Sequence, residues 1–123
     1  MLKRNRRLTN KGCIFCKIIN REIPAKIEFE NAEIMAFEDI RPQAPVHIMV
    51  IPKKHIEKVA DLDEKDSALA GRLILTAKDI AHKKGVETSG YRIVFNCNKD
   101  AGQEVFHLHL HLLGGRKFSW PPG

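Results

Sequence analysis

The segment His107–Leu113 alternates histidine with leucine and ends on a second leucine. Successive side chains of a β-strand point to opposite faces, so this pattern predicts a strand with three imidazoles on one face and leucines on the other. The leucine face belongs against a hydrophobic core, and a register shift of one residue would bury all three histidines. Valine, isoleucine or threonine would pack better in a strand, which indicates that the three histidines have a function.

Two kinds of chemistry suit three imidazoles in a row. His-x-His on a strand can ligate zinc, with the third histidine completing an open catalytic site. Alternatively, a neutral imidazole is a competent nucleophile at phosphorus near neutral pH, while its neighbours donate hydrogen bonds to phosphate oxygens and supply a proton. The residues alone leave both interpretations open.

Four further segments have the composition of strands. Together with the histidine segment, the expected strands are Lys26–Glu30, Ile34–Glu38, His47–Ile51, Tyr91–Asn96 and Phe106–Leu113. A turn is expected at Asp100–Gly102. Short connections and a single long helix between the strands predict an α+β domain with a mainly antiparallel sheet.

Two helices are expected, one short and one long. The short helix covers Cys13–Asn20. The long helix runs from about Glu64 to Lys84, with Asp63 as its N-cap and Gly85 as its C-terminal stop. Its apolar residues form one stripe that we expect to pack in the core: Leu69, Leu73, Ile74, Ala77, Ile80 and Ala81.

The positive charge is concentrated at the N-terminus. Residues 1–11 hold five basic residues and no acidic residue, which leaves +1 of the net charge of +6 for the rest of the chain. We therefore predict a basic, disordered tail over residues 1–12 and a single domain over residues 13–123. A nearly neutral domain argues against nucleic acid as a partner, and no apolar run is long enough to cross a membrane.

The cysteines indicate the compartment. Cys13, Cys16 and Cys97 are an odd number, and no secretory signal precedes them. This combination fits a reducing compartment rather than a disulfide framework, so we expect a cytoplasmic protein. Cys97 has no partner in the sequence pattern and is expected in the core.

The histidine segment resembles the signature of the histidine triad superfamily, in which apolar residues separate three histidines. Further segments resemble the nucleotide-binding Hint branch of that superfamily: Cys13–Ile19, Phe37–Pro45, Ile51–His55, Gly114–Arg116 and Trp120–Gly123. The similarity covers nearly everything after the basic tail, in the order of the family. It implies a HIT-like fold, with a sheet of about five strands, one long and one short helix, and a two-fold homodimer.

The resemblance implies an activity and a role for each histidine. The expected reaction is hydrolysis of purine nucleoside 5′-phosphoramidates, such as AMP-NH2 and AMP-lysine, through a nucleotidyl-histidine intermediate and without a cofactor. His109 would attack the α-phosphate, and His111 would bind phosphate oxygens and help the amine to leave. His107 would orient its neighbours, with His47 behind it as a partner. A third histidine favours hydrolysis over transfer, because the nucleotidyltransferase branch carries glutamine there.

The resemblance also implies a site for the AMP or GMP moiety. Apolar side chains would form the wall of the base pocket, Asp39 would accept hydrogen bonds from the ribose, and Gly102 would offer the phosphate a backbone N–H that a side chain would shield. Trp120 would lie near the partner subunit's active site or pack against its own subunit. The full expected set is Phe15, Ile18, Phe37, Asp39, Ile40, Asn96, Gly102, Gln103, Val105, His109, His111 and Trp120.

The Cys13-x-x-Cys16 pair places two thiols on one side of a helical turn. Many family members pair such cysteines with two histidines, so the resemblance implies a structural zinc site formed by Cys13, Cys16, His55 and His107. Four protein ligands would leave no open position, and the metal would brace the fold rather than catalyse. The alternative is a pair of buried free thiols.

Glu104 departs from the family pattern, since some members carry a small hydroxyl residue there. An ionised glutamate cannot donate a hydrogen bond and repels phosphate at short range. It therefore either points away or engages a basic leaving group. Three alternative functions stay open: a dinucleoside polyphosphate hydrolase, a zinc hydrolase that uses the triad directly, and a nucleotide-binding regulatory module with incidental hydrolysis.

Overall fold

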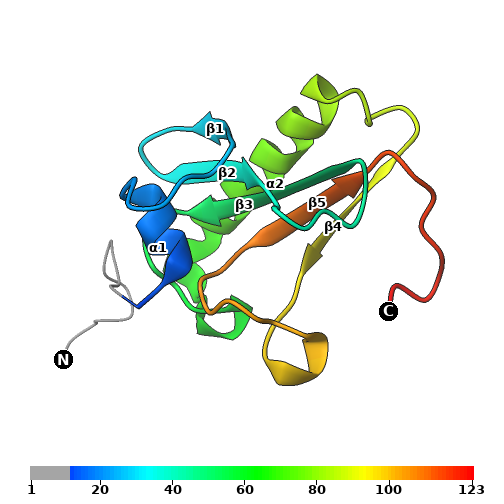
Figure 1. The fold of residues 1–123 in the computed structure, drawn as a ribbon. Helices are drawn as coiled ribbons and strands as arrows, with labels where there is room; N and C mark the ends of the chain where they lie inside the picture. The colour runs from blue at the N-terminus through cyan, green and yellow to red at the C-terminus, as the bar shows by residue number, and fades with distance from the viewer. Residues whose placement is uncertain (1–11) are drawn as a thin grey trace.

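The computed structural model describes residues 12–123, which form one sheet with helices on both of its faces (Figure 1). The strands are β1 (Ile27–Glu30), β2 (Ile34–Glu38), β3 (Val46–Pro52), β4 (Tyr91–Phe95) and β5 (Leu110–Gly114). They lie in the order β1-β2-β3-β5-β4, and every neighbouring pair is antiparallel. The predicted α+β class with a five-stranded antiparallel sheet is confirmed.

The two predicted helices are α1 (Ile14–Ile19) and α2 (Ser67–Lys83). Short 3₁₀ turns η2 (Val59–Asp61), η3 (Glu64–Asp66) and η4 (Lys99–Ala101) complete the elements. Asp63 and Asp66 form a capping box that begins η3, which leads directly into α2. Gly85 follows the end of α2 with a positive φ of 76°, as expected of a C-terminal stop.

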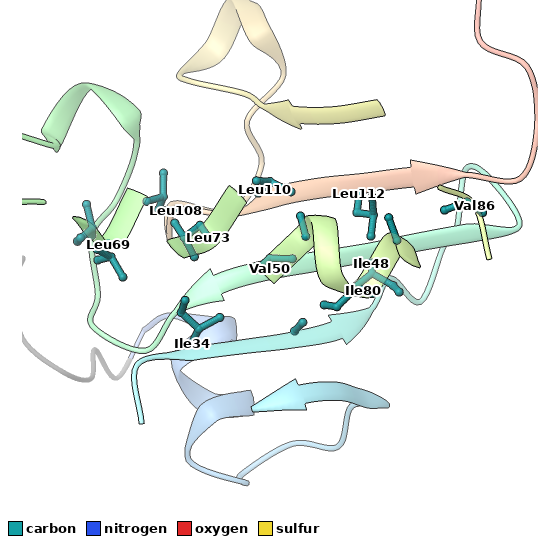
Figure 2. Packing of buried hydrophobic residues seen from close by; sticks show 14 residues of the cluster. Ile34, Ile48, Val50, Leu69, Leu73, Ile80, Val86, Leu108, Leu110 and Leu112 are labelled. Atoms are coloured by element: carbon teal, nitrogen blue, oxygen red, sulfur yellow. The ribbon is translucent and has the colours of Figure 1, made fainter. Parts of the chain in front are cut away.

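The main hydrophobic core lies between α2 and one face of the sheet (Figure 2). Leu108, Leu110 and Leu112 all belong to it, which confirms that the leucine face of the histidine segment packs inward. One prediction about α2 is wrong, because Ile74 is 44% exposed. At about 100° per residue it lies at the outermost edge of the apolar stripe, and the remaining stripe residues already cover the sheet.

The last strand begins later than predicted. We expected it from Phe106, but the ladder with β3 and β4 starts at Leu110. Before that point the chain bonds elsewhere, since the backbone N–H of Leu108 donates to the carbonyl of Ile56 at 2.6 Å. His107 and His109 therefore lie in an extended approach to β5, although their alternation with the leucines is kept.

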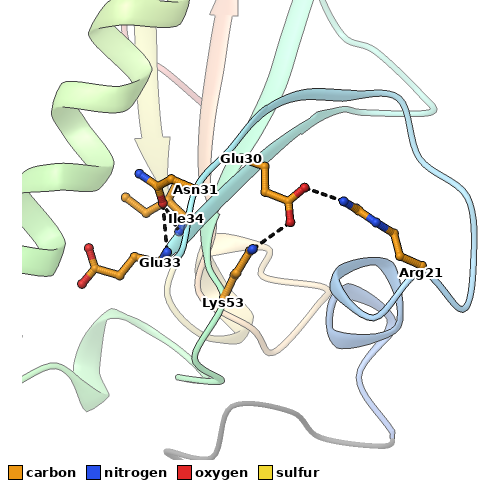
Figure 3. Close-up of polar contacts among 6 residues, drawn as sticks. All are labelled: Arg21, Glu30, Asn31, Glu33, Ile34 and Lys53. Atoms are coloured by element: carbon orange, nitrogen blue, oxygen red, sulfur yellow. Dashed lines mark hydrogen bonds and ion pairs between the residues drawn. The ribbon is translucent and has the colours of Figure 1, made fainter.

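Figure 3 shows the turn between β1 and β2, together with the ion pair that links Glu30 to the segment after α1. The side chain of Asn31 accepts hydrogen bonds from the backbone N–H groups of Glu33 and Ile34 at 2.9 and 2.8 Å, which closes the turn. Glu30 forms ion pairs with Arg21, just after α1, and with Lys53, just after β3. These contacts hold α1 over the face of the sheet that lies opposite α2.

Some predictions concern parts of the molecule that this structure does not test. The basic tail, apart from Gly12, lies outside the described residues 12–123. Within those residues β4 forms one edge of the sheet, and Ile93 on that strand is 38% exposed. The homodimer stays a prediction. No described helix combines the length and the apolar character needed to cross a membrane.

Candidate functional site

The histidines gather on the face of the sheet opposite α2. His111 lies on β5, opposite Met49 of β3 and Val94 of β4. His109 comes just before the strand, and its ring centroid is 4.9 Å from that of His111. Because alternate residues share a face, the two imidazoles stand side by side above the middle of the sheet.

The hydrogen bond made by His109 fixes which of its nitrogens carries the proton. Its Nδ1 lies 2.7 Å from the backbone carbonyl of His107, and a carbonyl can only accept. Nδ1 therefore carries the hydrogen, and Nε2 of the neutral ring has a free lone pair. The side chain is only 7% exposed, and burial lowers the pKa of His109 below its usual 6.5, against the hydrogen bond to the carbonyl, which raises it.

A second chain of hydrogen bonds fixes His111. The backbone N–H of Gln43 donates to Nδ1 of His47 at 3.0 Å, so a neutral His47 carries its proton on Nε2. That Nε2 lies 2.9 Å from Nδ1 of His111 and donates to it. Neutral His111 therefore presents an N–H at Nε2. Burial, with His109 and His47 nearby, lowers the pKa of His111 to about 4, so it stays neutral at neutral pH.

His47 is placed differently from the prediction. The resemblance implied a position behind His107, but His47 contacts His111, and Asp39 lies 3.5 Å from its Nε2. The reason is the register of β3, in which His47 pairs with Leu113 and so lies diagonally across from His111. The catalytic role expected of His47 thus runs through the last histidine of the triad rather than the first.

His107 faces away from the other two triad histidines and is fully buried. Its Nε2 donates to the carbonyl of Pro52 at 2.8 Å, which leaves a free lone pair on Nδ1. This Nδ1 lies 3.4 Å from the Sγ of Cys13, 3.6 Å from the Sγ of Cys16 and 3.2 Å from Nδ1 of His55. Burial lowers the pKa of His107 to about 4, so the neutral ring can act as a ligand.

Two groups of described residues bring ligand-type atoms within 4.8 Å of one another, and their spacings differ. The first is the cysteine and histidine group around His107. The second is Asp39, His47 and His111. In the second group the two ring nitrogens are 2.9 Å apart, a hydrogen-bond distance and shorter than the roughly 3.3 Å between two nitrogens bound to tetrahedral zinc. We therefore interpret the second group as a hydrogen-bonded chain.

A hollow of about 350 Å³ lies in front of His109 and His111. It is lined by Asp39, Arg41, Gln43, Asn96, Gly102, Glu104, Val105, His109 and His111. Six of these nine residues were predicted from the sequence to bind the nucleotide. The structure adds Arg41 and Gln43, which lie in the loop between β2 and β3, and Glu104.

The residues expected around the base are divided between buried and exposed positions. Phe15, Ile18 and Phe37 belong to a second core cluster between α1 and the sheet, and Phe15 contacts the ring of His109 edge to face. Ile40, by contrast, is 88% exposed. Trp120 is 83% exposed, so it does not pack against its own subunit within the described residues.

In the loop expected to hold the phosphate, two hydrogen-bonding groups already have partners within the protein. The backbone N–H of Gly102 already donates to the carbonyl of Lys99, and a Cβ added there would meet nothing within 4 Å. The glycine is explained by its φ of 84°, not by a shielding effect as we expected. The side chain of Gln103 is buried, and its amide donates to the carbonyls of Glu57 and Val105.

Two backbone groups that fix the site were missed from the sequence. The N–H of Gln43 sets the tautomer of His47, and the carbonyl of Pro52 sets that of His107. Both belong to segments quoted for the family resemblance, which is the only signal that pointed to them. Nothing in residue type identifies a backbone group as functional.

Comparison with known proteins agrees with this geometry. The sequence model of the HIT domain family matches residues 20–118. An uncharacterized HIT-like protein of Synechocystis sp. is 52% identical over 110 residues, which are 89% of this chain and 96% of that protein.

Solved structures are similar over nearly the whole described fold. The HIT family hydrolase of Legionella pneumophila is 54% identical, with a TM-score of 0.89 over 90% of this chain and 99% of that one. The HIT family hydrolase of Clostridium thermocellum is 43% identical, with a TM-score of 0.88 over 90% of this chain and 96% of that one.

Proposed function

The chain belongs to the HIT domain family and has the fold of the HIT family hydrolases it resembles, and on that premise we propose that it hydrolyses purine nucleoside 5′-phosphoramidates. The observation that carries the proposal is the free Nε2 lone pair of His109. It belongs to a buried, neutral imidazole at the wall of a hollow large enough for a phosphoryl group. Such a nitrogen is a nucleophile rather than a proton donor.

In the first step, Nε2 of His109 forms a bond to phosphorus and the bond from phosphorus to the amine nitrogen breaks. The His109 ring keeps its proton on Nδ1, where the carbonyl of His107 stabilises the positive charge that develops. The departing nitrogen is protonated from solvent and leaves as a neutral amine, while the N–H at Nε2 of His111 donates a hydrogen bond to a phosphate oxygen. The products of this step are a free amine and a nucleotidyl-histidine.

In the second step, water attacks phosphorus and His109 leaves as the neutral ring. Water gives up one proton to solvent and His109 regains its free Nε2, so the enzyme ends as it began. His47 donates to Nδ1 of His111 in both steps and so keeps the N–H of His111 at Nε2. AMP or GMP is released.

The geometry does not favour a zinc hydrolase that uses the triad directly. The free nitrogen of His107 faces the cysteines, and the free nitrogen of His109 faces the hollow. Among the described residues, neither group of side chains that could hold a metal ion includes His109. One metal ion could therefore not be shared by the three triad histidines without rotating at least one ring out of its hydrogen bonds.

The direct test is to mix the protein with adenosine 5′-phosphoramidate, quench within the first turnover, and measure the intact mass. We expect a transient gain of one AMP, followed by release of AMP, with and without a chelator. Turnover without an adduct that is lost on chelation would support the zinc hydrolase instead. Bound AMP with no turnover would support the regulatory module.

A pH profile tests the neutral state of His109. Because burial lowers the pKa of His109, its neutral form persists below the usual 6.5. We expect kcat/KM for a phosphoramidate with a non-titrating leaving group to stay level from pH 7 to below 6.5 and to fall only at lower pH. A midpoint at or above 6.5 would contradict a buried neutral nucleophile. Circular dichroism at each pH is the control for unfolding.

We also propose that Cys13, Cys16, His55 and His107 bind a structural zinc ion. Tetrahedral zinc with ordinary bond lengths places two nitrogens about 3.3 Å apart and a nitrogen and a sulfur about 3.6 Å apart. The two ring nitrogens here are 3.2 Å apart, and the nitrogen–sulfur distances are 3.4 to 3.6 Å. The four buried side chains therefore fit the metal, which would supply a cross-link between α1 and the segments after β3 and before β5.

The zinc proposal predicts a loss of stability rather than a loss of chemistry. We expect about one zinc per chain by elemental analysis, and a decrease in Tm of about 10 °C on chelation. Cys16→Ser should lose the zinc and reproduce the lower Tm, while Cys97→Ser should change neither. A zinc-supplemented protein that carries no metal, and whose Tm is indifferent to chelation, would support two free thiols.

A further inference from the structure

A second hollow, of about 360 Å³, adjoins the catalytic one. It is lined by Gly12, Cys13, Ile14, His55, Glu57, Glu104, Val105 and Phe106. The two hollows share Glu104 and Val105. Under the proposed function Asp39 binds the ribose, and the part of the catalytic hollow at Glu104, where it joins the second hollow, is available to the leaving group.

The buried side chain of Gln103 fixes the position of both acidic residues that line this second hollow. Its amide donates to the carbonyl of Glu57 at 2.9 Å and to the carbonyl of Val105 at 3.1 Å, while its oxygen accepts from the N–H of Asn98. One fully used amide thus ties residue 57 to the segment that carries Glu104. These hydrogen bonds hold the backbone of Glu57 beside the segment of Glu104, and both residues line the same hollow.

The charges along these walls are mainly negative. Glu104 forms no hydrogen bond or ion pair within residues 12–123. In the same residues Glu57 forms one ion pair, with Lys58 at 3.8 Å, and that lysine also pairs with Asp61. In the catalytic hollow Arg41 is the single cation among the described lining residues and Asp39 is a second acid.

His109 is 7% exposed and lines the catalytic hollow, so a substrate that reacts at its free Nε2 would place its leaving group close to Glu104. Because the catalytic hollow holds His109 and shares Glu104 with the second hollow, we propose that Glu104 and Glu57 form a leaving-group subsite that favours amines carrying a positive charge and disfavours anionic leaving groups. A carboxylate attracts an ammonium and repels a phosphate at the same distance. The polyphosphate chain of a dinucleoside polyphosphate would therefore be a poor leaving group here.

This inference rests on the proposed function, and three substrates of nearly equal length test it. Adenosine 5′-phosphoramidates are made from 1,5-diaminopentane, pentylamine and 6-aminohexanoate, which end in a cation, a methyl group and an anion. We expect kcat/KM to be about tenfold higher for the cationic than for the neutral substrate, and lowest for the anionic one, with the differences shrinking in high salt.

Each variant is judged by the ratio of its own three kcat/KM values, so a general loss of activity cancels. Glu104→Gln and Glu57→Gln should each reduce the cation-to-anion ratio several-fold, and the double variant should bring it close to one. Asp79→Asn removes a negative charge from α2, on the other face of the sheet, and should leave the ratio unchanged.

Two results separate failure of this inference from failure of the proposed function. Normal release of all three amines without discrimination, or discrimination that survives in the double variant, would overturn the leaving-group subsite and leave the hydrolase intact. Absence of any amine release from all three substrates would instead count against the proposed function itself.

Discussion

His109→Ala is expected to lower kcat/KM for adenosine 5′-phosphoramidate by about 10⁴-fold or more and to abolish the AMP adduct. Of the three triad histidines, His109 alone both lines the catalytic hollow and has an unprotonated ring nitrogen without a hydrogen-bond donor, its Nε2. Alanine removes the nucleophile without adding a new group. Water would then have to attack the phosphoramidate directly, with the remaining groups only binding the substrate.

Two controls keep this result interpretable. His82→Ala removes an exposed histidine of α2 that pairs with Glu87, and it should leave turnover unchanged. His109→Ala itself should keep the native circular dichroism spectrum, because the core on the α2 side does not include this ring. An AMP adduct that persists in the His109→Ala variant would show that another residue is the nucleophile and would overturn the mechanism.

The sequence predicts the fold well where the periodicity of side chains decides the structure. The alternation of histidine and leucine correctly placed Leu108, Leu110 and Leu112 in the core, because only one register buries three leucines. The prediction failed at the start of β5, because the first residue of that strand depends on hydrogen bonds with other segments of the chain. Pro52 ends β3, and the carbonyl of Pro52 is taken by the side chain of His107. The sequence of the histidine segment alone does not show that a side chain competes with the strand for the carbonyl of Pro52.

The candidate site shows the same division between residue type and tertiary contact. Residue types and the family resemblance identified most of the side chains that line the catalytic hollow. They could not assign the tautomers, since these depend on backbone groups of Gln43, Pro52 and His107 that lie up to 55 residues away along the chain. They also could not show that the Gln103 amide already donates to the backbone carbonyls of Glu57 and Val105.

The position of His47 is the case in which a tertiary contact changes the mechanism. A partner of His107 would act on the buried side of the site, next to the cysteines. A partner of His111 would set the N–H that binds the phosphate. His47 is 6% exposed and accepts from a backbone N–H on one nitrogen while it donates from the other, so both of its roles can be removed separately.

His47→Asn and His47→Gln separate these two roles. An asparagine amide oxygen takes the place of Nδ1 and can still accept from the N–H of Gln43, but it does not reach His111. A glutamine amide nitrogen takes the place of Nε2 and can still donate to Nδ1 of His111. We expect kcat to fall by about 10²-fold or more in His47→Asn and to stay within about tenfold in His47→Gln.

The order of the two variants is the decisive outcome, because their stabilities should run the other way. His47→Gln leaves the N–H of Gln43 without its acceptor and should have the lower Tm, whereas His47→Asn keeps that bond. Higher activity in the less stable variant can only come from the hydrogen bond to His111. If both variants lose activity equally, or if activity follows Tm, His47 acts through packing, and the N–H at Nε2 of His111 is not set by this chain of hydrogen bonds.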